Sequence, residues 1–248
     1  MRRAVLYGLA ALAASCTYPN DLTPAGAEPA PLRLLSSTPP AGGTAVPLGS
    51  AVTLVFDGFP DPSSLGRFGA VTLHSGVNSF DFTLAVDLVG KALVLQPRTP
   101  LTPGAGYDVE VGSALHGLDG AVATASHVGF TAGQTPGGGP PAPPRRTLAA
   151  DVQPLLDAGC ALSTCHDAST AAGGLPLDPA HARAALVGVD AAGAPGQTRV
   201  VAGNPASSYL LRKLLATPDI GGLPMPSGGQ WPLASIRLVS DWIAAGCP

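Results

Sequence analysis

The first half of the chain alternates apolar and polar residues in short segments that turn residues separate. Segment 52–56 shows the alternation, and a longer series with an apolar residue at every second position runs over 80–88. Such alternation places the apolar side chains on one face of a strand. Runs such as Thr102-Pro103-Gly104 supply the backbone angles of turns. About seven strands within 31–133 therefore predict an all-β sandwich.

From residue 148 onward the apolar period changes to that of a helix. Leu148, Val152 and Leu156 fall on one helical face, and Thr147 precedes them as an N-cap. The sequence therefore predicts a multidomain fold, in which an all-α domain over 148–248 follows the sandwich. Later helices are expected at 179–187 and 205–216, opened by Asp178-Pro179 and Asn204-Pro205, and at 233–245, with Gly246 as the stop.

Composition narrows the classes of function. The 248 residues include 13 basic and 16 acidic ones without a basic stripe, which argues against nucleic acid as a partner. Glycine and proline are abundant, at 32 and 27 residues, but 46% of the chain is apolar, so we expect folded, loop-rich domains. Proline and glycine concentrate in residues 134–147, which are predicted to form an extended linker.

The first residues have the pattern of an export signal. Two arginines follow Met1, and a short apolar run, too short to span a bilayer, ends at Ser15-Cys16. This junction resembles the lipobox of bacterial lipoproteins, which implies removal of residues 1–15 and lipidation of Cys16, followed by a tether over 16–30. An ordinary signal peptide cut nearby is the alternative. Either way we expect an extracytoplasmic protein, and the lipobox implies anchoring to a membrane, on the periplasmic side or the outer surface.

The sandwich region resembles a known family. The phrase over 96–111, followed by Gly117-Leu118-Asp119-Gly120 and Phe130-Thr131, is similar to bacterial Ig-like domains of cell-surface proteins. The resemblance covers 31–133 and implies a spacer or binding module without chemistry of its own. Its histidines, which have no metal-ligand spacing and are expected at the surface, are His74, His116 and His127.

The segment from Cys160 to His166 carries the most specific chemistry. Two cysteines that close onto a histidine can attach a haem through thioether bonds and present the histidine to the iron. The usual motif has two residues between the cysteines, whereas four residues separate Cys160 from Cys165 and must loop out. We expect one haem c, held covalently by Cys160 and Cys165, with His166 as an iron ligand.

Met225 is the candidate for the second iron ligand. It is the only methionine besides the initiator, and it lies between two prolines in a glycine-rich loop. A thioether on a stiff loop is a soft ligand that raises the reduction potential of a haem. His181 is the alternative at this position. With both axial positions filled, no iron site is open to substrate, so we expect an electron carrier rather than an enzyme.

Four phrases in the second half, at 173–178, 199–210, 223–226 and 241–246, follow one another in a recognisable order. Together with the cysteine motif they resemble the cytochrome c-like domains of bacterial surface proteins, related to class I cytochromes c. The resemblance spans 148–247. It implies haem binding, single-electron transfer, and a redox protein or a surface complex as the partner.

The third cysteine of this half leaves alternatives open. If Cys160 and Cys165 both bind haem, Cys247 is an odd thiol in an oxidising compartment. A disulfide between Cys160 and Cys247 would instead give a haem-free, stapled surface interaction module, and a disulfide between Cys160 and Cys165 would leave an unliganded histidine. The same three cysteines with His166 are also ligand types that suit zinc, although the paired spacing of zinc sites is absent.

Overall fold

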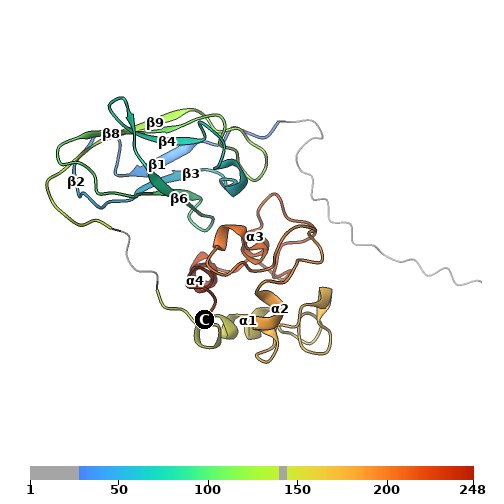
Figure 1. The fold of residues 1–248 in the computed structure, drawn as a ribbon. Coiled ribbons are helices and arrows are strands. Elements are labelled where there is room, and N and C mark those ends of the chain that lie inside the picture. Colours follow the sequence, from blue (N-terminus) through green and yellow to red (C-terminus); the bar gives the residue numbers. More distant parts are fainter. Residues whose placement is uncertain (1–27, 140–143) are drawn as a thin grey trace, which may run out of the picture.

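The computed structural model describes residues 28–139 and 144–248 (Figure 1). The first range forms a β-sandwich, and the second forms a unit of short helices and loops that we call the C-terminal unit. The predicted signal peptide over 1–15, the lipidation site Cys16 and most of the tether lie outside the described residues. Within the described ranges, none of the helices combines the length and hydrophobicity that crossing a bilayer requires.

The sandwich consists of two sheets. The first has the strand order β1-β3-β7-β6 and is antiparallel throughout. Its strands are β1 (Leu34–Thr38), β3 (Val52–Phe56), β6 (Phe82–Asp87) and β7 (Ala92–Pro97). The second has the order β2-β9-β8-β4-β5, and its β2–β9 pair is parallel. Its strands are β2 (Gly43–Val46), β4 (Val71–Ser75), β5 (Asn78–Ser79), β8 (Gly106–Val111) and β9 (Ser126–Ala132), and the short helix η1 (Pro62–Ser64) precedes β4.

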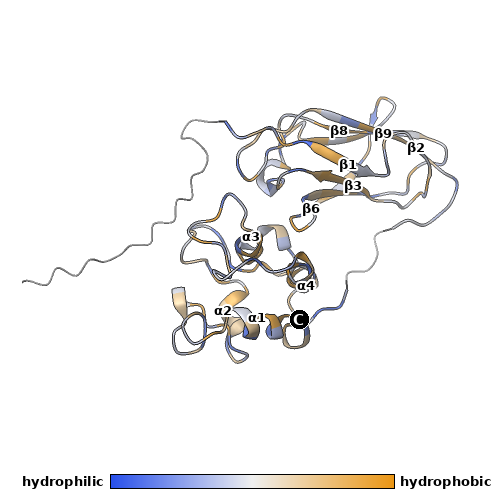
Figure 2. Cartoon of the chain, turned by 180° about the vertical axis from the view of Figure 1, so that it is seen from behind, coloured by the Kyte–Doolittle hydropathy of each residue, from blue (hydrophilic) through white to orange (hydrophobic). Residues whose placement is uncertain are grey.

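The alternation in the sequence accounts for the core of the sandwich. In β3, Val52, Leu54 and Phe56 are buried, while the residues between them are partly exposed. Figure 2 shows the hydrophobic colouring of β1 and β3. On the facing sheet, Tyr107 stacks on the ring of Phe130 with 5.5 Å between centroids. Burial of these side chains from both sheets stabilises the fold, and the predicted all-β sandwich is confirmed.

The C-terminal unit contains helices that are mostly shorter than two turns. The longest, α4 (Leu233–Ala244), has 12 residues. Thr147 caps the first helical segment as predicted, because its hydroxyl oxygen accepts a hydrogen bond from the backbone N–H of Ala150 at 3.2 Å. The other helices are η2 (Leu148–Val152), α1 (Gln153–Gly159), η3 (Ala172–Gly174), α2 (Ala182–Leu186), η4 (Pro205–Ser207) and α3 (Tyr209–Leu215).

The prediction of an all-α cytochrome c-like domain is wrong. The regular sheets of the described chain are the two of the sandwich, and the C-terminal unit joins its short helices by long stretches of turn and loop. Isolated β-bridges pair Thr198 with both Asp190 and Ser208. The helix expected over 205–216 is broken at Ser208, whose backbone is extended. Local caps and apolar spacing specify where a helix begins, but they do not make a long helix where extended residues and turns interrupt the chain.

Candidate functional site

A cavity of about 820 Å³ opens in the C-terminal unit, and its wall contains Cys160, Cys165, His166 and Met225. Cavities that hold small molecules and cofactors have volumes of about 300–1,000 Å³. The structure therefore brings together all four residues that the sequence suggested for haem attachment and iron ligation. The remaining wall is mainly apolar, and its larger hydrophobic members include Leu156, Leu177, Leu186, Leu214, Trp231 and Val239.

The four residues between the cysteines form a turn, and two of them, Leu162 and Thr164, also line the cavity. Helix α1 ends at Gly159, and Cys160 follows as its C-cap. The backbone N–H of His166 donates to the carbonyl of Cys160 at 3.1 Å, and the N–H of Cys165 donates to the carbonyl of Leu162 at 2.8 Å. These bonds close the turn and draw its two ends together. The widened spacing therefore still leaves Cys160, Cys165 and His166 on one cavity wall.

The ring of His166 is oriented by a backbone carbonyl. Its Nδ1 lies 3.1 Å from the carbonyl oxygen of Leu175. Because that oxygen can only accept a hydrogen bond, the neutral imidazole carries its proton on Nδ1 and its lone pair on Nε2. Metal-binding histidines usually show this arrangement, in which the second ring nitrogen is held by a carbonyl or a carboxylate.

The loop that contains Leu175 is itself held by Arg199. The guanidinium of Arg199 donates to the carbonyls of Gly173 at 3.1 Å and Gly174 at 3.2 Å, and to that of Ala185 in α2 at 2.8 Å. Arg199 also lines the cavity. It thereby joins the loop that contains Leu175 to helix α2. The sequence gave no sign of the role of the Leu175 carbonyl, because any residue presents a carbonyl.

The three cysteines of the C-terminal unit are free thiols, and each has a different environment. Burial, with a smaller contribution from the neighbouring Cys165, raises the pKa of Cys160 to about 11. Burial also raises the pKa of Cys247, whereas the nearby charge of Arg183 opposes that rise. Cys247 is fully buried and is not part of the cavity wall. Cys160 therefore has Cys165 as its neighbour at the cavity, whereas Cys247 lies in the buried core to which Cys160 also belongs.

Helix α3 fixes the loop that presents Met225. The backbone N–H of Met225 donates to the carbonyl of Lys213 at 3.0 Å. The Lys213 ammonium donates to the carbonyl of Leu223 at 2.6 Å and also to that of Gly221. The hydroxyl of Tyr209 accepts a hydrogen bond from the N–H of Gly221 at 2.8 Å. Lys213 and Tyr209 thus hold the methionine loop against the cavity, a role that the sequence analysis missed.

The charged side chains of the cavity wall are basic. Arg199 and Lys213 line it, and the residues that form the wall include no aspartate or glutamate. Burial lowers the pKa of Lys213, because an apolar surrounding disfavours its charged form. An anionic group on a bound molecule would offset that cost. The cavity therefore suits a largely apolar molecule with carboxylates at its edge.

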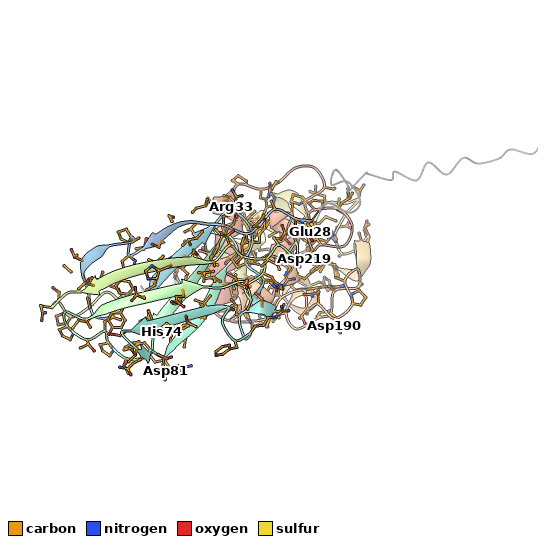
Figure 3. All side chains as sticks on the ribbon, turned by 90° about the horizontal axis from the view of Figure 1, so that it is seen from above. Glu28, Arg33, His74, Asp81, Asp190 and Asp219 are labelled. Atoms are coloured by element: carbon orange, nitrogen blue, oxygen red, sulfur yellow. The ribbon has the colours of Figure 1, made fainter. Side chains whose placement is uncertain are left out.

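The other candidate ligands lie elsewhere. His181 is exposed, pairs with Asp178 at 2.8 Å and is absent from the cavity wall. On the sandwich, His127 pairs with Asp108 at 2.7 Å, and Figure 3 shows His74 at the end of the sandwich away from Asp190 of the C-terminal unit. Within 28–139 and 144–248, histidine, cysteine and acidic side chains do not gather in groups of three that could hold a metal ion. The zinc alternative therefore has no support.

Comparison with known proteins identifies the first half of the chain. Residues 28–132 match the family model of the bacterial Ig-like domain, which confirms the expectation drawn for 31–133. Domains of this family are typically extracellular, in agreement with an extracytoplasmic protein. No curated protein matches the chain.

Several solved structures share limited similarity with the chain. The N-terminal part of the bacterial S-layer protein SbsC is 14% identical with a TM-score of 0.33, covering 42% of this chain and 24% of that one. The methionine-rich copper resistance protein PcoC from Escherichia coli is 22% identical with a TM-score of 0.32, covering 42% and 99%. An L,D-transpeptidase from Mycobacterium smegmatis is 13% identical with a TM-score of 0.31, covering 42% and 40%. The chain thus spans about a quarter of the S-layer chain, and similarity at this level carries no functional argument.

Proposed function

We propose that the C-terminal unit binds one haem c and that the protein is a lipid-anchored, extracytoplasmic electron carrier. The observation that supports this most directly is the shared cavity wall of Cys160, Cys165, His166 and Met225. These residues come from two loops about sixty positions apart in the chain. A cysteine pair, a histidine with Nε2 free and a methionine form the set of groups that attaches a haem and ligates its iron.

Each of these four residues has a defined role in the proposal. Cys160 and Cys165 would hold the haem through thioether bonds, each adding its S–H across a vinyl group, so attachment would consume no oxidant. His166, through Nε2, and Met225, through its sulfur, would ligate the iron, and a bound haem would supply a one-electron couple. The apolar wall would contact the porphyrin, and Arg199 and Lys213 would face the propionates. Because the chain itself would supply both iron ligands, we propose electron transfer with a redox protein or surface complex rather than catalysis.

A second candidate function is a haem-free surface interaction module. It is favoured by the burial of Cys160 and Cys247 in one apolar core, together with Leu156, Leu186 and Trp242. A disulfide between these two cysteines would join the end of α1 to the residues after α4 and would leave Cys165 as the only free thiol of the cavity wall. The Ig-like sandwich would then act as the binding module or spacer, as its family usually does.

Mass spectrometry of the mature chain separates the two candidates. Protein matured with c-type assembly factors is expected to gain the mass of one haem, and peptides that contain Cys160 and Cys165 should carry it. Cys247 should be recovered as a free thiol under non-reducing digestion. A colourless protein of apo mass with a cross-linked Cys160–Cys247 peptide would instead establish the haem-free module.

The proposed anchor has its own test. Replacing Cys16 by serine removes the only sulfur at the lipobox, so Cys16→Ser is expected to abolish fatty-acid labelling and to move the protein from the membrane to the soluble fraction. The measurement is metabolic labelling with a fatty acid, followed by fractionation. Ser15→Ala, a neighbouring change that keeps the cysteine, is the control. Unchanged labelling of Cys16→Ser would contradict the lipid anchor.

A further inference from the structure

The turn between β6 and β7 of the Ig-like sandwich packs into the C-terminal unit. Leu88, at the tip of this turn, is 2% exposed and belongs to the apolar core around α1 and α4 rather than to the sandwich core. Val86 and Val89 beside it are partly buried against the same core. Figure 1 shows α3 and α4 on the side of the C-terminal unit that faces β6, and α1 and α2 farther away.

A two-point ion pair reinforces this contact. The guanidinium of Arg237 in α4 donates to both carboxylate oxygens of Asp87, at 2.7 and 2.9 Å. The same carboxylate accepts a hydrogen bond from the backbone N–H of Gly90 at 3.1 Å. Asp87 therefore shapes the β6–β7 turn and holds α4 at the same time. Paired, charge-assisted hydrogen bonds of this kind fix orientation better than a single contact does.

Helix α4 carries this contact on one side and the cavity on the other. Val239 lies two residues after Arg237, which is about 200° around a helix, so the two side chains project from opposite faces. Val239 is fully buried and lines the cavity. The helix is thus held between the β6–β7 turn and the cavity.

We infer that the Ig-like sandwich is a structural part of the cavity, because its β6–β7 turn holds α4 in the position that closes the cavity wall. The sandwich and the C-terminal unit then act as one body, although a proline-rich segment joins them in sequence. The contact between the β6–β7 turn and α4 does not depend on what the cavity binds. Only its effect on a bound haem rests on the proposed function.

Charge reversal in the haem-free, full-length protein tests the inference. Asp87→Arg and Arg237→Asp are each expected to lower the hydrogen-exchange protection of α4 by roughly tenfold and to raise the alkylation rate of Cys160 by a similar factor. The double variant Asp87→Arg/Arg237→Asp should restore most of the α4 protection and most of the resistance of Cys160 to alkylation. Restoration is not expected to be complete, because Asp241 lies one turn from position 237 and repels an aspartate there.

Asp81→Arg is the matched control. It makes the same charge change on the same sandwich, and Figure 3 shows Asp81 at the end away from the C-terminal unit. Asp87→Asn is a milder change that gives a folded variant if the charge reversals do not fold. It is expected to lower the protection of α4 roughly threefold. The inference is overturned if α4 protection and Cys160 alkylation in the Asp87 and Arg237 variants match those of Asp81→Arg. Because these readouts need no haem, failure of the proposed function would leave this result interpretable.

Discussion

Replacing both Cys160 and Cys165 by serine is expected to abolish covalent haem attachment, so that no haem remains with the denatured polypeptide. Both cysteines line the cavity together with His166, and serine cannot form a thioether. Each single variant should retain haem through one bond, in reduced amount. The measurement is haem staining of the denatured chain, calibrated by its protein content.

Cys247→Ser is the matched control for this experiment. It makes the same substitution at a buried cysteine outside the cavity wall. Covalent haem is expected to remain in this variant. If the Cys247 variant loses haem as completely as the double variant, attachment depends on the fold rather than on the two cavity thiols. If the double variant still retains covalent haem, the assignment of the attachment sites is wrong.

Trp242→Ala is expected to lower the free energy of unfolding of the C-terminal unit by about 3–5 kcal/mol, enough to unfold much of it. Trp242 is fully buried among Leu156, Leu186 and Ile243, so its removal leaves a cavity that the short helices cannot fill. Denaturant unfolding followed by circular dichroism measures the effect.

Trp231→Ala provides the comparison, because Trp231 is half-buried at the cavity wall. Trp231→Ala is expected to lower the free energy of unfolding by clearly less than Trp242→Ala does, since part of the Trp231 surface already contacts solvent. Equal losses for the two tryptophans would contradict the division between a packed core and an open cavity.

The sandwich could be predicted from the sequence because alternation has a direct structural cause. The residues of β3 face the core at every second position, and the family comparison agrees. The series over 80–88 also predicted β6, but strand pairing ends at Asp87, and Leu88 contacts the C-terminal unit instead. An alternating pattern shows which residues are buried. It does not show against which part of the chain they are buried.

The C-terminal unit was less predictable from the sequence, although its four candidate residues could be picked out. Cys160, Cys165, His166 and Met225 are rare residue types in suggestive contexts, and the structure places them on one wall. The helices were overestimated, because capping residues such as Asn204 open a three-residue 3-10 helix as readily as a long one. The hydrogen bonds of His166 to the Leu175 carbonyl and of Lys213 to the Leu223 carbonyl involve backbone atoms that every residue has, so the sequence did not indicate them.

The pyridine haemochrome spectrum of the full-length protein, matured with c-type assembly factors, tests the proposed haem site most directly. The spectrum reports the number of vinyl groups that thioether bonds have saturated. We expect one haem per chain with both vinyl groups saturated, because Cys160 and Cys165 both line the cavity beside His166. A protein without a haemochrome spectrum, in which the three thiols or a Cys160–Cys247 disulfide account for all cysteines of the C-terminal unit, would contradict the account.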